Sequence, residues 1–171
     1  MKFYPQLRNL FVFAFLSFSA SLFAQSTAVA TEEYKAGNEG WHVYLDKAYK
    51  ESKETGKPIL ANFTGKRWCG WCKRLNKSVF VHDEFKKWAE ENVVLLELDY
   101  PRRPPMPPAD IAAQNRNLQQ AFQVRGYPSI WLFDLDKDDA GEYSISALGK
   151  TGYRKSVAEF TGDIEKMLAK R

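Results

Sequence analysis

Residues 59–73 read Ile-Leu-Ala-Asn-Phe-Thr-Gly-Lys-Arg-Trp-Cys-Gly-Trp-Cys-Lys, and this stretch decides the fold. The apolar run from Ile59 to Phe63 predicts a short buried strand, and Thr64-Gly65 predicts the turn that ends it. Cys69 and Cys72 follow directly and are the only two cysteines of the chain. The cysteine pair is therefore expected at a junction between a strand and a helix.

The spacing of the two cysteines favours a reactive disulfide. A bond between them closes a very short loop, so it stabilises the chain little through entropy. We expect a helix from about Cys69 to Lys77, which places Cys69 beside unpaired N–H groups and the positive end of the helix dipole. Both favour a thiolate. Cys69 is the predicted nucleophile, and Cys72, one turn further along, is the predicted resolving thiol.

Other interpretations of the pair stay open at this point. A structural disulfide suits an exported protein. A zinc site needs about four ligands, and the remaining soft ligands, His42 and His82, are far from a second paired motif. Haem attachment requires a histidine after the second cysteine, where this chain has Lys73. We therefore expect no metal site and no cofactor beyond the redox-active disulfide itself.

Basic residues surround the cysteines in the sequence. They either lower the pKa of the thiols or form an ordinary solvated surface. The four cations are Lys66, Arg67, Lys73 and Arg74.

The N-terminus predicts export. Residues 1–24 carry only positive charge and an apolar run from Leu10 to Phe23, which is typical of a cleaved signal peptide and short for a membrane span. An uncleaved anchor is the alternative. Residues 25–40 are small and polar and predict a flexible segment, followed by one domain over residues 41–171. We expect a periplasmic protein that does not span the membrane after cleavage.

The remaining elements alternate between helix and strand. The order predicts an α/β domain with a central mixed sheet of four to five strands and helices on both faces. The first helix is expected from Trp41 to just before Gly56, and a second segment, with Val81 and Phe85 inward, is expected to end at Asn92. A further helix is expected from about Asp110, as its cap, to Gly126. The last helix should follow a capping box formed by Ser156 and Glu159. Further strands are expected over 93–98, 129–133 and 142–148, and an extended proline-rich loop over 100–108.

Composition excludes several functional classes. The formal net charge of +4 is too small to predict a nucleic-acid-binding protein. The sequence contains no nucleotide-binding glycine loop and no internal repeat. The aspartates between Asp134 and Asp139 do not fit a calcium loop, because the glycine falls at the wrong position and Ile145 replaces the final acid. We expect a monomer.

Three motifs resemble the thioredoxin superfamily, and in particular its exported thioredoxin-like proteins. They are Asn62-Phe63-Thr64-Gly65, Trp68-Cys69-Gly70-Trp71-Cys72-Lys73 and Gly126-Tyr127-Pro128-Ser129-Ile130. The resemblance covers about Trp41 to Lys170 and implies the thioredoxin fold and thiol–disulfide exchange. It gives Cys69 the role of nucleophile and Cys72 that of resolving thiol.

The resemblance also implies a substrate-binding surface. Pro128 corresponds to the cis-proline beside the disulfide, and the backbone of Tyr127 would pair with an extended substrate segment. Trp68, Gly70 and Trp71 flank the thiols as further substrate contacts.

The chain departs from thioredoxin at two positions. Thioredoxin carries a buried aspartate where this chain has Asn62, and an amide accepts no proton from the resolving cysteine. Glu97 or Asp99 on the next strand is the candidate replacement, and Lys73 and Asn62 are expected to modulate the thiol pKa. Gly70-Trp71 replaces the Gly-Pro of thioredoxin, so the redox potential does not transfer.

We expect an exported protein-disulfide oxidoreductase that acts on protein or peptide substrates, in the reducing direction, and is recharged by a membrane electron donor. The alternatives are a non-catalytic thioredoxin-fold module that binds peptides as a chaperone, and a disulfide oxidase or isomerase. These hypotheses differ in redox potential and in whether Cys69 forms mixed disulfides.

Overall fold

A computed structural model of the chain describes residues 34–171. The expected signal peptide over residues 1–24 and the first part of the expected flexible segment over residues 25–40 lie outside the described residues. No helix within residues 34–171 is long and apolar enough to cross a membrane.

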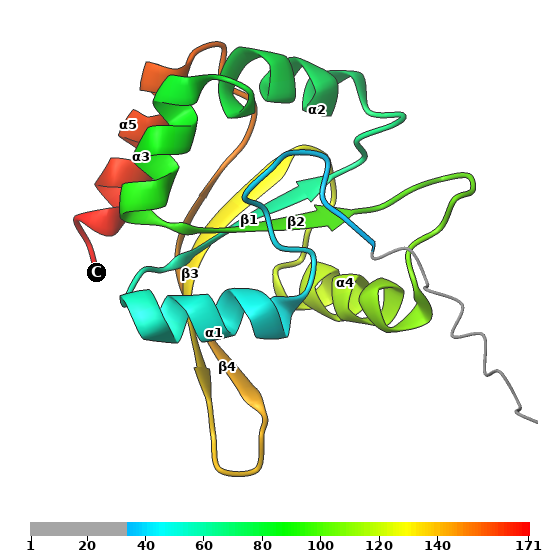
Figure 1. The fold of residues 1–171 in the computed structure, drawn as a ribbon, viewed down its shortest axis with the longest axis vertical. Coiled ribbons are helices and arrows are strands. Elements are labelled where there is room, and N and C mark those ends of the chain that lie inside the picture. Colours follow the sequence, from blue (N-terminus) through cyan, green and yellow to red (C-terminus); the bar gives the residue numbers. More distant parts are fainter. Residues whose placement is uncertain (1–33) are drawn as a thin grey trace, which may run out of the picture. The chain divides into compact units, whose positions relative to one another are not determined.

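A mixed four-stranded sheet in the order β2-β1-β3-β4 forms the centre of the described unit (Figure 1). β1 (Ile59–Thr64) runs parallel to β2 (Val94–Asp99) and antiparallel to β3 (Ser129–Lys137). β3 in turn pairs antiparallel with β4 (Tyr143–Thr151). Because β1 has a neighbour on each side and packing on both faces, all of its residues are buried, which explains its unbroken apolar sequence.

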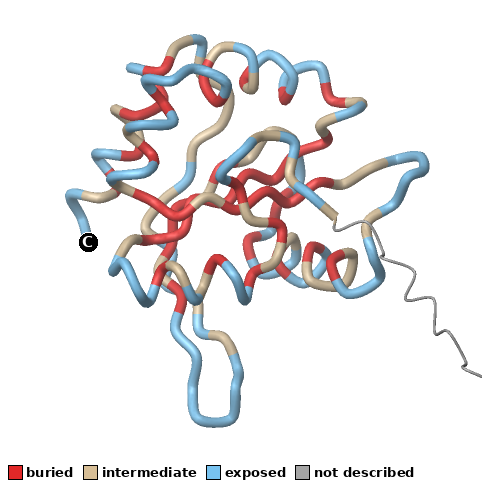
Figure 2. The backbone as a smooth tube through the Cα atoms, in the orientation of Figure 1, coloured by how far each residue is buried: buried red, intermediate tan, exposed pale blue. Residues whose placement is uncertain are grey.

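Helices cover both faces of the sheet, as Figures 1 and 2 show. The core on one face includes residues from α1 (Leu45–Thr55) and the end of α4 (Ala109–Ala121). The other core contains residues from α2 (Gly70–Leu75), the π-helix η1 (Asn76–Phe80), α3 (Asp83–Asn92) and α5 (Val157–Leu168). Side chains of a strand alternate between faces, so Leu60 joins the second core while its neighbours Ile59 and Ala61 join the first. The α/β class and the mixed sheet expected from the sequence are confirmed.

Two of the predicted helical faces are wrong in detail. Trp41 precedes α1 and packs in the opposite core, against Phe80 and Phe85, because His42 forms a β-bridge with Leu96 and holds this segment extended. Val81 was expected to point inward but is 44% exposed. The π-helical turn η1 adds a residue ahead of it, so that Phe80 joins the core instead, beside Val79, which was expected to point inward and is buried.

The ends of α4 also differ from expectation. Pro108 occupies the N-cap position and no side chain caps the helix, so Asp110 lies inside the first turn. The helix ends at Ala121, and Gln123 rather than Gly126 takes the positive φ of 49° that follows it. The predicted cap of α5 is confirmed, because Ser156 Oγ accepts a hydrogen bond of 3.3 Å from the Glu159 amide.

Candidate active site

Cys69 and Cys72 form a disulfide at the junction of β1 and α2. Cys69 is the N-cap of α2, and its Sγ accepts a hydrogen bond of 3.1 Å from the backbone N–H of Cys72. Both cysteines are almost fully buried, with 6% and 5% of their surface exposed. In the reduced protein, the same N–H stabilises a negative charge on Cys69 more than a neutral thiol.

Gly65 positions Trp68 directly before the disulfide. The carbonyl oxygen of Gly65 accepts hydrogen bonds from the amides of Trp68 and Cys69, at 3.0 and 2.8 Å, and so closes the turn. A Cβ on residue 65 would lie only 2.7 Å from two atoms of the Trp68 ring. The indole Nε1 donates 2.7 Å to the carbonyl oxygen of Tyr100 at the end of β2. Glycine is therefore required where Trp68 folds back over the strand end.

Tyr127 and Pro128 lie against the disulfide from the start of β3. The carbonyl oxygen of Tyr127 is 3.6 Å from the Sγ of Cys69, and the Tyr127–Pro128 peptide bond is cis. The Tyr127 ring packs edge-on against Trp68, with ring centres 5.7 Å apart. Burial raises the pKa of the Tyr127 phenol, so this group is a neutral hydrogen-bonding wall at physiological pH.

Trp71 is the exposed member of the motif, with 53% of its surface accessible. Its ring packs on Tyr153 at 5.0 Å between centres. The loop of Tyr153 reaches the active site because Gly152 lies beside the Pro128 carbonyl oxygen. A Cβ on Gly70 would meet nothing within 4 Å, so the backbone between the two cysteines is open to an approaching chain.

Asn62 and Lys73 border a cavity on the inner side of the disulfide. The cavity has a volume of about 280 Å³, and Cys72 and Glu97 also line it. Asn62 pairs with Glu97 in the register of β1 and β2, and its Oδ1 atom is buried without a hydrogen-bond partner among the described residues. The expected acid position thus holds an unpaired amide oxygen, and a carboxylate stands on the neighbouring strand.

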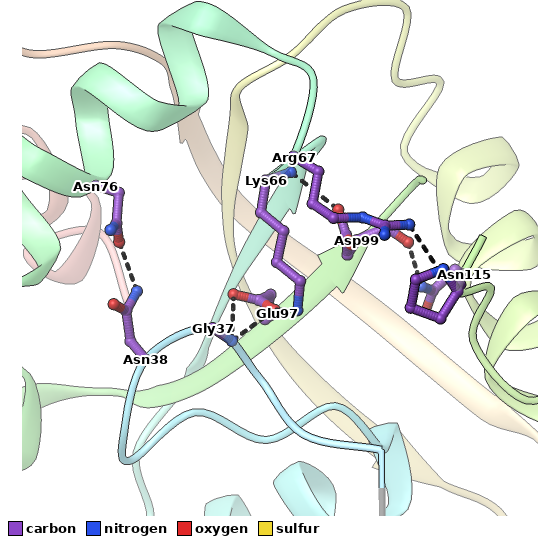
Figure 3. A network of polar contacts seen from close by, with 9 residues as sticks. Gly37, Asn38, Lys66, Arg67, Asn76, Glu97, Asp99 and Asn115 are labelled. Atoms are coloured by element: carbon purple, nitrogen blue, oxygen red, sulfur yellow. Dashed lines mark hydrogen bonds and ion pairs between the residues drawn. The ribbon is translucent and has the colours of Figure 1, made fainter. Parts of the chain in front are cut away.

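Glu97 is held by a network that Figure 3 shows. Its oxygens accept hydrogen bonds of 3.0 and 3.1 Å from the Gly37 amide, and Oε1 lies 3.1 Å from the Lys66 ammonium. Only 4% of Glu97 is exposed. Burial raises the pKa of Glu97 above its ordinary value, although Lys66 and the Gly37 amide oppose the rise. Asp99, also expected as a candidate acid, accepts a hydrogen bond of 3.0 Å from the backbone amide of Lys66.

The segment from residue 34 to residue 40, which we name the strap, contacts this network and the active-site helices. Its Gly37 amide binds Glu97, and Asn38 Nδ2 donates 2.6 Å to Asn76 Oδ1 (Figure 3). Burial is the main cause that raises the pKa of Tyr34 to about 12, and the negative charges of Asp99 and Glu97 contribute to the rise. The ordered contacts of the domain therefore begin before Trp41, within the segment expected to be flexible.

The proline-rich loop over residues 100–108 is tied to the active site by Arg67. The Arg67 guanidinium donates to the carbonyl oxygens of Arg103, Pro104 and Pro105, and the last two distances are 2.9 and 2.8 Å. The Arg102 guanidinium lies over the Trp68 ring. Sequence reasoning missed the contacts of Arg102, Tyr153 and the strap, because each joins segments far apart in the chain.

The sequence of residues 45–144 matches the family described as the thioredoxin-like domain. The chain belongs to this family. Solved structures with the thioredoxin fold also match the chain. The structure of DsbH oxidoreductase matches with a TM-score of 0.64 and 25% identity, over 82% of this chain and 94% of that one. A thioredoxin from Thermus thermophilus matches in fold, with a TM-score of 0.52 and 17% identity over 74% of this chain and 85% of that one.

Curated relatives of this thioredoxin-like chain carry disulfide-related names. The disulfide bond reductase DsbH of Chlamydia pneumoniae is 28% identical over 74% of this chain and 75% of its own length. The thioredoxin-related protein DsbJ of the same organism is 31% identical over 84% of this chain. The thiol:disulfide interchange protein DsbD of Colwellia psychrerythraea is 27% identical over 95% of this chain. The chain spans only 39% of DsbJ and 26% of DsbD.

The thioredoxin-like family and the Cys69–Cys72 disulfide together make the chain a protein-disulfide oxidoreductase. Within residues 34–171 no group of three or more His, Cys, Asp or Glu side chains is placed to hold a metal ion.

The raised pKa of Glu97 predicts a pH-dependent stability difference. A carboxyl whose pKa is higher in the folded protein stabilises that state fully at low pH, and the contribution is lost as the pH rises from 4.5 through the folded pKa. Glu97→Gln removes this loss, so the variant should gain stability relative to the parent between pH 4 and pH 8. Urea unfolding of both proteins across this range measures the difference.

Glu91→Gln is the matched control, because Glu91 is exposed on α3. Its stability difference from the parent should not show the pH-dependent gain expected of Glu97→Gln. A Glu97→Gln difference that is equally flat would contradict the raised pKa.

Proposed function

We propose that this protein is an exported oxidoreductase that reduces disulfides in other proteins, with Cys69 as nucleophile and Cys72 as resolving thiol. The observation that carries the proposal is the position of the Cys69 sulfur, between the Cys72 amide at 3.1 Å and the Tyr127 carbonyl oxygen at 3.6 Å. The name of the relative DsbH, a disulfide bond reductase, supports the reducing direction. The apolar run within residues 1–24 supports export to the periplasm.

The reaction proceeds in two exchanges. The Cys69 thiolate attacks one sulfur of the substrate disulfide, a Cys69–substrate disulfide forms, and the other substrate sulfur leaves as a thiolate that takes a proton. The Cys72 thiolate then attacks the Cys69 sulfur, the second substrate sulfur leaves, and the Cys69–Cys72 disulfide closes. The substrate gains two electrons and the protein loses two.

The walls of the site position the substrate. The backbone of Tyr127, beside Pro128, hydrogen-bonds to an extended substrate segment as an added strand would. The open backbone at Gly70 lets that segment approach Cys69, and the rings of Trp68 and Trp71 contact its apolar side chains. These five residues are the substrate-binding surface that the motif predicts.

Glu97 accepts the proton of Cys72 before the second exchange. Asn62 has no basic group. Its Oδ1 has no partner among the described residues, so it can accept a hydrogen bond from a water in the cavity that Cys72, Glu97 and Lys73 also line. A polar cavity of about 280 Å³ is large enough for water, which can carry a proton between the thiol and the carboxylate. Lys73 favours the Cys72 thiolate by its positive charge, whereas the acceptor Oδ1 of Asn62 favours the protonated thiol, so the two residues modulate the thiol pKa in opposite directions.

A reductase in an oxidising compartment needs a source of electrons. A membrane-bound protein with a reduced thiol pair supplies them in this proposal, by the same exchange run in reverse. The DsbD relative, named for thiol:disulfide interchange, supports such a partner. The protein acts as a monomer and requires no cofactor other than its disulfide.

Cys72→Ser is expected to trap substrates. Without the resolving thiol, the Cys69–substrate disulfide cannot be released by the second exchange. Mixed disulfides should therefore accumulate in the native cells and appear as thiol-sensitive bands on non-reducing gels. They should be recovered from the exported fraction, bound to a chain that begins near Gln25.

Cys69→Ser/Cys72→Ser is the control and should trap nothing. If Cys72→Ser binds peptides as the parent does but forms no covalent complexes, the protein is instead a peptide-binding module, for which the exposed Trp71 beside the disulfide is the supporting observation.

Glu97→Gln is expected to lengthen the lifetime of the mixed disulfide. The variant keeps a side chain of the same shape but cannot take the Cys72 proton, so the second exchange should slow about 10- to 100-fold at pH 7. Rapid-quench measurement of the complex with a disulfide-bonded peptide gives this rate. The rate should recover as the pH approaches the pKa of a free thiol, because Cys72 then ionises without a base. An unchanged rate at pH 7 would show that Glu97 does not take part in the mechanism.

The direction of the reaction follows from the equilibrium potential of the Cys69–Cys72 couple. A potential near about −270 mV, the value of thioredoxin, measured against glutathione buffers, would support the proposed reducing direction. A value near about −120 mV, as in strong periplasmic oxidants, would identify an oxidase, and an intermediate value near about −180 mV an isomerase.

A further inference from the structure

Two arginine–tryptophan pairs stand on either side of Cys69. The Arg102 guanidinium lies 3.5 Å from the centre of the Trp68 ring, and the Arg74 guanidinium lies 4.7 Å from the centre of the Trp71 ring. Each tryptophan also packs on a tyrosine, Trp68 on Tyr127 and Trp71 on Tyr153. Four separate segments of the chain therefore build two similar stacks around one sulfur atom.

Stacking holds each guanidinium in place and leaves its N–H edge free to donate hydrogen bonds. Neither Arg74 nor Arg102 has a hydrogen bond or ion pair with a residue in the described range, although the charge of Arg102 also acts on the nearby Tyr127 phenol. A fixed guanidinium edge matches a carboxylate, which accepts two parallel hydrogen bonds from it. The two arginines are therefore prepared to bind acidic groups.

The exposed charge on the segments around Cys69 has one sign, because Glu97 and Asp99 are buried. Residues 66–74, 100–108, 125–128 and 152–155, which we name the rim, contain nine of the 25 Lys and Arg of the chain and none of its 21 Asp and Glu. Three of these cations pair with carboxylates that lie outside these ranges. Six have no ion pair with a described residue and are exposed: Arg67, Lys73, Arg74, Arg102, Arg103 and Arg125. Such a field attracts an acidic partner and repels a basic one.

We propose that the rim recognises an acidic, extended segment of the substrate protein, with Asp or Glu on both sides of its reactive cysteine bound by Arg74 and Arg102. This inference rests on the proposed function, because the segment is the one whose disulfide Cys69 attacks. It adds a substrate class, since the aromatic rings alone would accept any exposed apolar chain. A peptide that runs across the disulfide can contact both stacks. The paired stacks therefore fit such a peptide better than a flat anionic surface, which would contact any exposed cation.

Three matched peptides test the preference. Each is a disulfide-linked dimer of the same sequence, with Glu, Gln or Lys at the second position on either side of the cysteine. The purified protein, recharged by dithiothreitol, should show kcat/KM for the Glu peptide about tenfold above the Gln peptide and further above the Lys peptide at 20 mM NaCl. The ratio should fall towards one at 500 mM NaCl, because salt screens exposed charges.

The Gln peptide separates this inference from the proposed function. If no peptide is reduced, the proposed function fails. If all three peptides are reduced at equal rates, the proposed function stands and the acidic preference is overturned.

Variants locate the preference. Arg74→Gln/Arg102→Gln should lower the ratio of Glu to Gln peptide to near one, and Arg74→Lys/Arg102→Lys should leave a smaller, fully salt-sensitive ratio because lysine lacks the fork. Lys50→Gln/Lys170→Gln is the control for net charge, because it also removes two positive charges; Lys50 is exposed on α1, over the other face of the sheet, and Lys170 is exposed at the C-terminus. It should keep the preference of the parent.

Three results would overturn the proposal. One is a ratio that Arg74→Gln/Arg102→Gln leaves unchanged. Another is binding of the parent to phosphatidylglycerol vesicles that is lost in this variant and competes with the Glu peptide, which would assign the rim to a lipid surface. The third is a concentration-dependent dimer in sedimentation that the same variant abolishes, which would assign the rim to the acidic β3–β4 hairpin of a second copy.

Discussion

The packing of Trp68 against the bare backbone of Gly65 is the contact on which the active site depends. It turns the chain back at the end of β1, so that the Gly65 carbonyl oxygen receives the amides of both Trp68 and Cys69. Cys69 thereby becomes the N-cap of α2 and receives the Cys72 amide. The same indole binds the end of β2 through Tyr100 and the entrance of β3 through Tyr127. One side chain thus connects the three neighbouring strands to the reactive sulfur.

The electrostatic arrangement has two layers on opposite sides of the disulfide. On the inner side, the carboxylate of Glu97 is buried beside an unpaired amide oxygen, with Lys66 and the strap as its partners. On the outer side, exposed cations and aromatic rings face the solvent. Ionising a buried acid costs free energy, because burial disfavours the charged form. The exposed cations are accessible to a partner, so they suit the recognition that we propose, whereas the buried carboxyl of Glu97 suits the proposed proton transfer.

The sequence predicted the sheet, the helix layers and the strand-to-helix position of the cysteines, because all of these follow from local apolar periodicity and short motifs. It could not place Trp41 or Val81 correctly, since a β-bridge to Leu96 and one π-helical turn changed the side of the chain that faces the core. The motif residues Asn62, Trp68, Trp71 and Tyr127 were all found. The contacts of Gly37, Arg102 and Tyr153 were not predicted, because each joins residues 34 to 82 positions apart, a separation that no local sequence pattern reveals.

The departure at Asn62 explains why the strap is ordered where it is. A buried aspartate at this position would place a second carboxylate opposite Glu97 in the strand register, and two such charges would repel in a poorly solvated site. With an amide there, a single carboxylate remains to be satisfied, and the Gly37 amide and Lys66 ammonium together supply its donors. The strap also binds Asn76 just after α2, so it contacts both the acid and the helix that carries Cys72. In the proposed mechanism, the proton that leaves Cys72 neutralises Glu97 and removes its charge from the Gly37 contact, which would link this proton transfer to the contact between the strap and the active-site helix.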